Sequence, residues 1–287
     1  RKREYSMIIH NMKTNRQVNP IGIDSRSLCF SWNVQATRKN WKQEAYRIIL
    51  VNKREALQDE EEFLWDTGWL ETDLMVNIIY TGSELSSDTR YYWQVSVIAN
   101  DSDDISTSEI TYFETGLFHA SDWRGKWIGE VEDHNYHIFR KNFRLEKEIQ
   151  RAKLYVCGLG HYEFNINGTR IGDCQLEPGW TNYNKSCIYS SYDVTKELKK
   201  GDNALGNFLG DGMYNVPGGR YVYYSRTFGK CKLLVQMNIT YKDGTTTEIV
   251  TDETWRMAPS PIKFCCIYGG EDYDSRLERS DEHTSEL

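Results

Sequence analysis

Residues 151–215 read RAKLYVCGLGHYEFNINGTRIGDCQLEPGWTNYNKSCIYSSYDVTKELKKGDNALGNFLGDGMYN, and this run specifies the architecture of the larger part of the chain. Apolar and polar residues alternate in HYEFNI, residues 161–166, with the two-residue period of a strand that buries one face. Asn167 and Gly168 follow directly, and this pair supplies the two positive-φ residues of a type I′ turn. The run therefore predicts a β-hairpin.

The strands around this hairpin extend it into one domain, which we predict over residues 127–278. Residues 233–241 form a long alternating strand that turns at Asp243-Gly244 and returns. Residues 193–201 predict a short helical turn, with an aspartate placed to cap it and a glycine to end it. Many strands, one helical turn and no βαβ alternation favour an antiparallel jelly-roll (galactose-binding-like) β-sandwich.

A second, smaller β-sandwich is predicted over residues 19–116. LCFSWN (28–33) alternates apolar and polar residues, and RYYWQVSVIA (90–99) is rich in aromatic and β-branched residues, which suit a pleated surface. The segment 53–63 is interpreted as a loop with one helical turn. With the strand YRIILV (46–51) and the closing YFETG, the pattern resembles a fibronectin type III domain. The whole chain is therefore expected to be all-β.

Three further segments complete the predicted organisation. Residues 1–18 are expected to be an N-terminal extension. Residues 117–126 are expected to be a linker. Trp123 within it and Trp127 directly after it are expected to pack between the domains, with sugar binding as the alternative. Residues 279–287 are polar and aperiodic, and we interpret them as a non-native tail joined at a truncation. Because the chain does not begin with Met, we expect a fragment or a processed product, and cytoplasmic and exported localisations both stay open.

The composition sets the broad class. The chain has 287 residues, of which 39% are hydrophobic and 13% aromatic, and this suits about two soluble domains. The net charge of -7 provides no basic field for nucleic acid. No apolar run approaches the roughly 20 residues of a membrane-spanning helix. The seven cysteines form no CxxC pair, so buried thiols are favoured over a zinc ribbon, while disulfides remain open.

One glycine-rich motif invites a nucleotide-binding interpretation. Gly158-Leu-Gly160 begins like a dinucleotide fingerprint, but Glu163 stands where the third glycine should be. A strand and a hairpin follow instead of a helix, so a phosphate group would meet no helix N-terminus. We therefore reject nucleotide binding.

A dense carboxylate group, made of Glu271, Asp272 and Asp274, invites a catalytic interpretation. Glycoside hydrolysis needs two carboxyl groups, either about 5 Å or about 6.5–9.5 Å apart. Neighbouring carboxylates within one loop more often pair with arginines, such as Arg276 here. The structural interpretation is therefore favoured for this group.

Two loops carry side chains that suit a sugar: EPGWTNYN (177–184) and GDGMYN (210–215). Aromatic rings can cover the C–H face of a sugar while amides and carboxylates bind its hydroxyls. The two glycines of the second loop would let a ligand come close to the backbone. The candidate carbohydrate-binding residues are Trp180, Asn182, Tyr183, Asn184, Asp211 and Asn215.

Asp211 is also a candidate calcium ligand, because calcium could add oxygen coordination to sugar hydroxyls. No cofactor is expected to be required. The alternative interpretation is that Trp180 packs inside the domain and that Asp211 satisfies backbone amides of its own loop. Residue chemistry alone favours neither alternative.

Four segments taken in order carry a family resemblance: LYVCGLGHYEFNINGTRIGD, LEPGWTNYNKSCIYSSYDVT, GDNALGNFLGDGMY and TDETWRMAPSPI…YGGEDYDSRLE. They resemble the N-terminal β-sandwich of bacterial α-L-rhamnosidases, family 78 of the glycoside hydrolases, over residues 127–278. The preceding YFETGL…DWRGKWIG is similar to the same family's junction with its leading fibronectin-like domain.

The resemblance implies a parent enzyme that hydrolyses terminal α-L-rhamnosides with inversion. Its two catalytic carboxylic residues belong to a C-terminal (α/α)₆ barrel that follows another β-domain. No catalytic residue is therefore carried over to this chain. In some members the matching sandwich binds rhamnose with calcium, and this implies rhamnose-containing glycosides as ligands.

Three hypotheses follow for the chain. The first is a non-catalytic N-terminal part of an α-L-rhamnosidase that provides a scaffold and accessory substrate recognition. The second is a stand-alone calcium-dependent rhamnose-binding module. The third is a purely structural spacer, which would expose a large apolar face in isolation. Neither nucleic acid nor membrane is expected as a partner.

Overall fold

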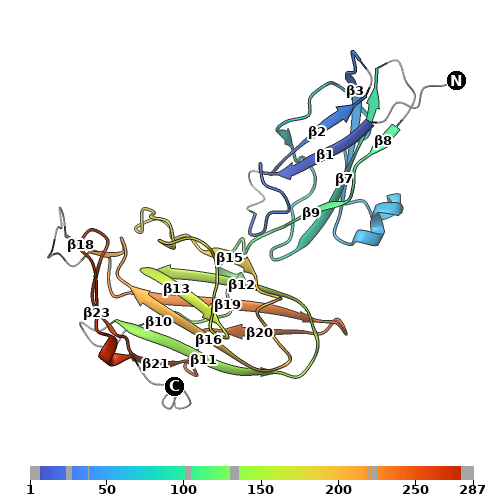
Figure 1. Ribbon diagram of the computed structural model, residues 1–287. Coiled ribbons are helices and arrows are strands. Elements are labelled where there is room, and N and C mark those ends of the chain that lie inside the picture. The colour runs from blue at the N-terminus through green and yellow to red at the C-terminus, as the bar shows by residue number, and fades with distance from the viewer. Residues whose placement is uncertain are drawn as a thin grey trace. The chain divides into compact units, whose positions relative to one another are not determined.

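The structure is a computed structural model that describes residues 7–23, 28–37, 39–100, 105–129, 136–216, 218, 220 and 225–278. The chain forms two compact units, residues 1–122 and 123–287 (Figure 1). The division lies inside the segment 117–126, which the sequence predicts as a linker. None of the described helical segments has the length and apolar character that a membrane crossing requires.

The first unit is built from two antiparallel sheets. One sheet has the order β1-β2-β6, and the other has the order β4-β3-β7-β8, with β5 paired to β3 and β9 to β7. The strands are β1 (Met7–Thr14), β2 (Cys29–Ala36), β3 (Gln43–Val51), β4 (Trp65–Asp66), β5 (Leu70–Glu71), β6 (Ile78–Ile79), β7 (Arg90–Ala99), β8 (Ile105–Thr107) and β9 (Thr111–Glu114). This is the β-sandwich that the sequence predicts.

Aromatic rings fill the space between these two sheets. Along β7 every second residue is buried, as expected for a strand with one face in the core. The ring of Phe30 on β2 lies 4.7 Å from that of Trp93 on β7. The Trp93 indole Nε1 donates a 3.1 Å hydrogen bond to Thr14 Oγ1, so its polar edge is satisfied inside the core.

The N-terminal boundary of the first sandwich differs from the prediction. Residues 7–14 are not an extension but strand β1, which pairs with β2 and buries Ile9 and Met12. A bulge between His10 and Lys13, with Asn11 at φ 53°, breaks the apolar-polar alternation. The two-residue alternation that predicts the other strands is therefore absent from residues 7–14.

The loop after β3 contains two 3₁₀ turns, η2 (Arg54–Gln58) and η3 (Glu60–Glu62). The predicted helical turn in the segment 53–63 is thus present in the tighter 3₁₀ form. The predicted tail 279–287 lies outside the described residues.

The second unit is a two-layer antiparallel β-sandwich. One sheet has the order β10-β19-β12-β15, with β20 paired to β19, and the other has the order β14-β13-β16-β11-β21. The strands are β10 (Ile128–Gly129), β11 (His137–Leu145), β12 (Ile149–Leu159), β13 (His161–Ile166), β14 (Thr169–Arg170), β15 (Ser190–Asp193), β16 (Gly201–Gly210), β19 (Lys232–Tyr241), β20 (Thr246–Val250) and β21 (Arg256–Pro259). This confirms the predicted sandwich class.

Two small hairpins and one 3₁₀ turn complete the second unit. They are β17 (Asn215–Val216) with β18 (Arg226–Thr227), β22 (Ile262–Cys266) with β23 (Gly270–Tyr273), and η5 (Ser275–Leu277). Between the two large sheets lies an apolar core, to which β12 contributes Leu154 and Val156 and β19 contributes Val235 and Met237. Figure 1 shows β12 and β19 lying across from β16 and β11.

The predicted hairpin is confirmed. Ile166 at the end of β13 pairs with Thr169 of β14, and Asn167 and Gly168 between them have φ values of 51° and 82°. The Asn167 side chain also accepts from Ala204 N at 3.0 Å and donates to Asn203 Oδ1 at 2.9 Å. The turn residue therefore joins the hairpin to β16.

Gly160 marks the point where the chain passes from one sheet to the other. Its φ is 126°, and a Cβ built on it would lie 2.3 Å from the carbonyl oxygen of Gly210. A side chain is excluded here by backbone contact, so packing explains this glycine. The chain continues as strand β13, as the sequence predicts.

The predicted helical turn at 193–201 is wrong. The segment forms a hydrogen-bonded turn, in which Asp193 Oδ1 accepts from Thr195 N at 3.0 Å. Asp193 is the last residue of β15 and Gly201 the first of β16, and the residues between them form a turn rather than a helix. The Asp193 side chain therefore accepts a hydrogen bond from the backbone N–H two residues later. This arrangement is an Asx turn and not the cap of a helix.

Trp123 of the predicted linker and Trp127 directly after it differ in environment. Trp123 packs edge to face against Tyr155 and Tyr189, with ring centroids 6.3 Å and 5.5 Å away. These partners belong to the second unit, so Trp123 is part of that unit's packing. Trp127 is 42% exposed.

Candidate functional site

The loop between β14 and β15 presents Trp180 to solvent, with 65% of its surface exposed. The backbone carbonyl of Asn182 accepts from Lys185 N and Ser186 N, and its side-chain Oδ1 accepts from Asn184 N at 3.2 Å. Asn182 therefore stabilises its own turn. Asn182 and Asn184 are both exposed.

Tyr183, the fourth candidate of this loop, is held by aromatic packing. Its ring lies 5.2 Å from that of Tyr214 and 5.3 Å from that of Phe228, both edge to face. Burial raises the pKa of the Tyr183 phenol. The loop is thus anchored through Tyr183 beside the second candidate loop, while Trp180 stands outside this cluster.

Asp211 is buried, with 6% of its surface exposed. Its Oδ2 accepts a 2.6 Å hydrogen bond from the Tyr136 hydroxyl, and its Oδ1 accepts a 2.6 Å bond from Asn215 Nδ2. Burial and the bond to Asp211 raise the pKa of Tyr136 far above its usual range. Two of the predicted site residues, Asp211 and Asn215, are therefore brought together in a buried network.

The role of Asp211 as a calcium ligand stays a prediction. Its carboxylate already accepts hydrogen bonds at both oxygens. In the part of the chain that the structure describes, no group of three or more His, Cys, Asp and Glu residues is arranged to hold a metal ion. A calcium ion at Asp211 would need oxygen ligands from other residue types or from water.

The carboxylates near the end of the second unit are paired with arginines. Asp272 makes two hydrogen bonds to Arg220, at 2.9 Å and 2.7 Å, and Asp274 makes two to Arg276, at 2.8 Å and 2.7 Å. These hydrogen bonds lower the pKa of both aspartates. The structural interpretation made from the sequence agrees with this geometry.

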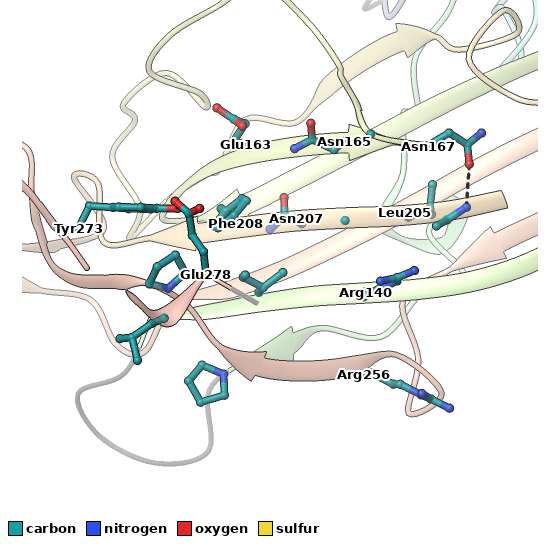
Figure 2. Close-up of a pocket in the computed structure, with 17 residues that line it drawn as sticks. Arg140, Glu163, Asn165, Asn167, Leu205, Asn207, Phe208, Arg256, Tyr273 and Glu278 are labelled. Atoms are coloured by element: carbon teal, nitrogen blue, oxygen red, sulfur yellow. Dashed lines mark hydrogen bonds between the residues drawn. The ribbon is translucent and has the colours of Figure 1, made fainter. Parts of the chain in front are cut away.

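A groove that the sequence did not predict lies on the outer face of the β13-β16-β11-β21 layer (Figure 2). Its volume is about 620 Å³, within the range of small-molecule sites. Its polar lining side chains include Arg140, Glu163, Asn165, Arg256 and Tyr273. The groove therefore combines hydrogen-bonding groups of both charges with an aromatic ring.

Small residues form the floor of this groove. Ala204 and Gly206 of β16 face outward, while Leu205 and Leu209 face the core. A Cβ built on Gly206 would meet no atom within 4 Å, so neither packing nor a positive φ requires glycine there. A larger side chain at this position would instead fill the groove.

The groove continues into a second hollow of about 500 Å³ along the same face. Arg140, Asn167 and Ala204 line both hollows, so they form one elongated depression. The sequence contains a signal for it, since the outward positions of GDNALGNFLG include Ala204 and Gly206. These small residues indicate a groove only once the register of the four strands β13, β16, β11 and β21 is known.

Two protein-family models match the chain. The model described as "Alpha-L-rhamnosidase N-terminal domain" matches residues 147–286, and the model described as "Rha78A-like, N-terminal immunoglobulin domain" matches residues 9–119. Together they cover most of both structural units, in the order in which these occur. The chain carries the N-terminal domains of the α-L-rhamnosidase family. The first match includes residues 279–286 of the predicted non-native tail, whose assignment stays a prediction.

Individual members of the family match over almost the entire chain. An α-L-rhamnosidase from Formosa agariphila is 34% identical over 98% of this chain, which covers 32% of that relative. An α-L-rhamnosidase from an Alteromonas species is 31% identical over 91% of this chain, which covers 30% of it. The chain thus spans about a third of the length of these relatives.

Solved structures of the family have the same fold. The α-L-rhamnosidase from Dictyoglumus thermophilum matches with a TM-score of 0.84 and 35% identity, over 96% of this chain and 32% of that one. The Streptomyces avermitilis α-L-rhamnosidase, solved in complex with L-rhamnose, also has a TM-score of 0.84 but 21% identity, over 95% of this chain and 43% of its own. At 21% identity, the similarity to the Streptomyces avermitilis enzyme shows only that the two proteins share a fold.

Proposed function

We propose that this chain is the non-catalytic N-terminal part of an α-L-rhamnosidase, providing a scaffold and accessory substrate recognition. The observation that carries the proposal is the 34% identity over 98% of the chain to an α-L-rhamnosidase of which the chain covers 32%. The described residues form strands, turns and short 3₁₀ segments, in two sandwiches. The Asp272 and Asp274 carboxylates are paired with arginines rather than with each other.

For the whole protein we propose hydrolysis of terminal α-L-rhamnosides with inversion. One carboxylic acid would protonate the leaving oxygen while a second activates a water, with the two groups about 6.5–9.5 Å apart. The family resemblance assigns these two residues to a C-terminal (α/α)₆ barrel that follows a further β-domain. Those domains would be the intramolecular partners of the two sandwiches.

Accessory recognition is supported by the surface of the second unit. The groove over Ala204 and Gly206 offers amide, guanidinium and carboxylate groups beside the ring of Tyr273. Sugars need such a combination, because their hydroxyls take hydrogen bonds while their C–H faces need apolar cover. A purely structural spacer would gain nothing from an open groove with these side chains.

The rival function is a calcium-dependent rhamnose-binding module that uses the Trp180 and Asp211 loops. The exposed ring of Trp180 is the observation that favours it. Asp211→Ala alone cannot test the rival, because it also breaks the buried bond to Tyr136. Trp180→Ala is the better variant, because it removes an exposed side chain and should leave folding intact.

Titration calorimetry with L-rhamnose and a rhamnose-containing oligosaccharide, with and without calcium, tests these alternatives. Accessory recognition predicts binding of the oligosaccharide by the 287-residue chain. Calcium-dependent binding that Trp180→Ala abolishes would favour the binding-module function. Absence of binding to either ligand would leave the structural spacer as the function of the chain.

A further inference from the structure

Two cysteines face each other where the loop between β14 and β15 returns to the sheet. Cys157 lies on β12 and is buried, whereas Cys187 lies shortly before β15 and is exposed. The Cys157 thiol donates to the sulfur of Cys187, and the two Sγ atoms are 3.6 Å apart. A disulfide joins its sulfurs at about 2.05 Å, so a small rotation of the two side chains would bring them to bonding distance.

The strand pairing brings the two backbone segments together. β12 pairs with β15, and Val156 is the register partner of Ser190. Cys157 follows Val156 directly, and Cys187 belongs to the residues that lead into Ser190. The Cys157 sulfur also lies 3.4 Å from the carbonyl oxygen of Ile188, the residue after Cys187. The two cysteines are therefore neighbours through their backbones as well as through their sulfurs, as a disulfide requires.

The two thiols differ in ways that suit a stepwise oxidation. Cys187 is exposed, so a small reagent can reach its sulfur, while Cys157 is buried and can be reached only from Cys187 or after an opening of the loop. The hydrogen bond that Cys157 donates lowers the pKa of Cys187 and raises the pKa of Cys157. The thiolate is the form that attacks a disulfide. Cys187 is therefore suited to attack first, and Cys157 to resolve the product.

We propose that Cys157 and Cys187 form a dithiol site that a low-molecular-weight disulfide oxidises to an intramolecular disulfide. The Cys187 thiolate attacks one sulfur of the reagent, forms a mixed disulfide and releases the first thiolate. Cys157 then loses its proton, attacks Cys187 Sγ and releases the second thiolate. The two protein thiols lose two electrons and two protons, and one reagent disulfide is reduced to two thiols.

The new bond would anchor the loop of residues 171–189 to β12, a strand of the core. This loop presents the exposed ring of Trp180, and Tyr183 already holds it through aromatic packing. The disulfide would add a covalent attachment at Cys187, close to the point where the loop enters β15. Oxidation would thus restrict the segment that carries Trp180. This consequence does not depend on whether the chain binds a sugar.

Tryptic peptide mapping of the 287-residue chain tests the proposal, because trypsin separates the cysteines of this region. Cleavage after lysine and arginine gives peptides 154–170, 171–185 and 186–196, which carry Cys157, Cys174 and Cys187 in this order. The chain is equilibrated with glutathione disulfide, and its remaining thiols are alkylated before digestion. We expect peptide 154–170 to be linked to peptide 186–196, and dithiothreitol to separate them.

Three variants assign the roles of the two thiols. Cys187→Ser should abolish the linked peptide, because it removes the attacking thiol. Cys157→Ala removes the resolving thiol, so Cys187 should accumulate as a mixed disulfide with glutathione. Cys174→Ser is the matched control, because Cys174 is another exposed cysteine of the same loop, and the link should form in it as in the wild type. Thermal unfolding under reducing conditions verifies that each variant folds.

The Tm of the second unit measures the anchoring. The two cysteines are 30 residues apart in sequence, so their bond would close a loop of that length in the unfolded chain. We expect the oxidised chain to unfold about 5–10 °C above the reduced chain. The increase should persist in Cys174→Ser and vanish in Cys187→Ser. Equal Tm values for the linked and the reduced chain would contradict the anchoring of the loop.

Three mapping results would overturn the proposed site. They are the absence of any linked peptide, a link that runs through Cys174, and a glutathione adduct that persists on Cys187 while Cys157 is present. The first and third would show that the two sulfurs do not reach bonding distance in solution. None of these results bears on the proposed function, which rests on the sequence identity to α-L-rhamnosidases.

Discussion

The Tyr136 hydroxyl donates a 2.6 Å hydrogen bond to Asp211 Oδ2, across 75 residues of sequence. The same hydroxyl accepts a hydrogen bond from Cys265 N at 3.0 Å and lies 3.1 Å from Cys265 O. One phenol thus joins the segment before β11, the loop after β16 and the hairpin strand β22. Asp211 is therefore part of the framework of the second unit.

Tyr136→Phe should lower the free energy of unfolding by about 1–3 kcal/mol, because it leaves a buried carboxylate oxygen without this donor. Chemical denaturation measures the change. Tyr273→Phe is the control, since Tyr273 is half exposed and its bond to Glu278 lies at the surface. We expect it to change stability by less than about 0.5 kcal/mol. Equal effects of the two variants would contradict a structural role for the Tyr136–Asp211 bond.

His161 should make stability depend on pH. Burial lowers its pKa from the ordinary value of 6.5, so the unfolded chain takes up this proton first as the pH falls. The neutral imidazole therefore contributes stability that is present above pH 6.5 and is lost as the pH falls through the folded-state pKa.

Thermal unfolding at intervals from about pH 7.5 to pH 5 measures this effect. The Tm of the chain should fall across this range, and His161→Gln should show a smaller fall. A His161→Gln variant with the full wild-type slope would show that other groups cause the pH dependence.

Asn167 should be a sensitive position in the hairpin. Asn167→Ala places a Cβ-bearing residue without a polar side chain at φ 51° and removes the bonds to Ala204 and Asn203. We expect a loss of about 2–4 kcal/mol. Asn167→Gly keeps the backbone freedom and loses only the bonds, so its loss should be about 1 kcal/mol smaller. Denaturant titration of both variants separates the two contributions, and identical losses would contradict the role of φ.

Asn207 should be replaceable by an apolar residue with a gain in stability. Its side chain is fully buried between register partners Phe139 and Phe164, and neither its Oδ1 nor its Nδ2 has a hydrogen-bond partner among the described residues. Asn207→Leu removes this unsatisfied amide and keeps the branched shape of the side chain, so stability should rise by about 1 kcal/mol. A loss of stability in denaturant titration would contradict this and would indicate that the amide is satisfied in solution.

The parts of the fold that follow from local chemistry could be predicted from the sequence. The Asn167-Gly168 turn and the alternation of residues 161–166 together specify one hairpin, and neither signal depends on the rest of the chain. Strand β1 could not be predicted in this way, because a bulge at Asn11 removes its period.

The candidate site could be predicted only in part. The sequence identified the pairing of carboxylates with arginines, but it left open whether the Trp180 ring is exposed or packs inside the domain. It left open whether Asp211 is a ligand or a structural group, because the deciding partner, Tyr136, is 75 residues away. The groove was missed because Arg140, Gly206 and Arg256 meet only through the register of β16, β11 and β21.

The most direct test of the central proposal is hydrolysis of p-nitrophenyl α-L-rhamnopyranoside by the purified 287-residue chain. The proposal predicts no release of p-nitrophenol above the buffer rate, because the carboxylic acid and base are assigned to a domain outside this chain. A longer version of the protein that includes that domain should release it readily. Release by the 287-residue chain itself, retained through repeated purification, would contradict the proposal that these two sandwiches are non-catalytic.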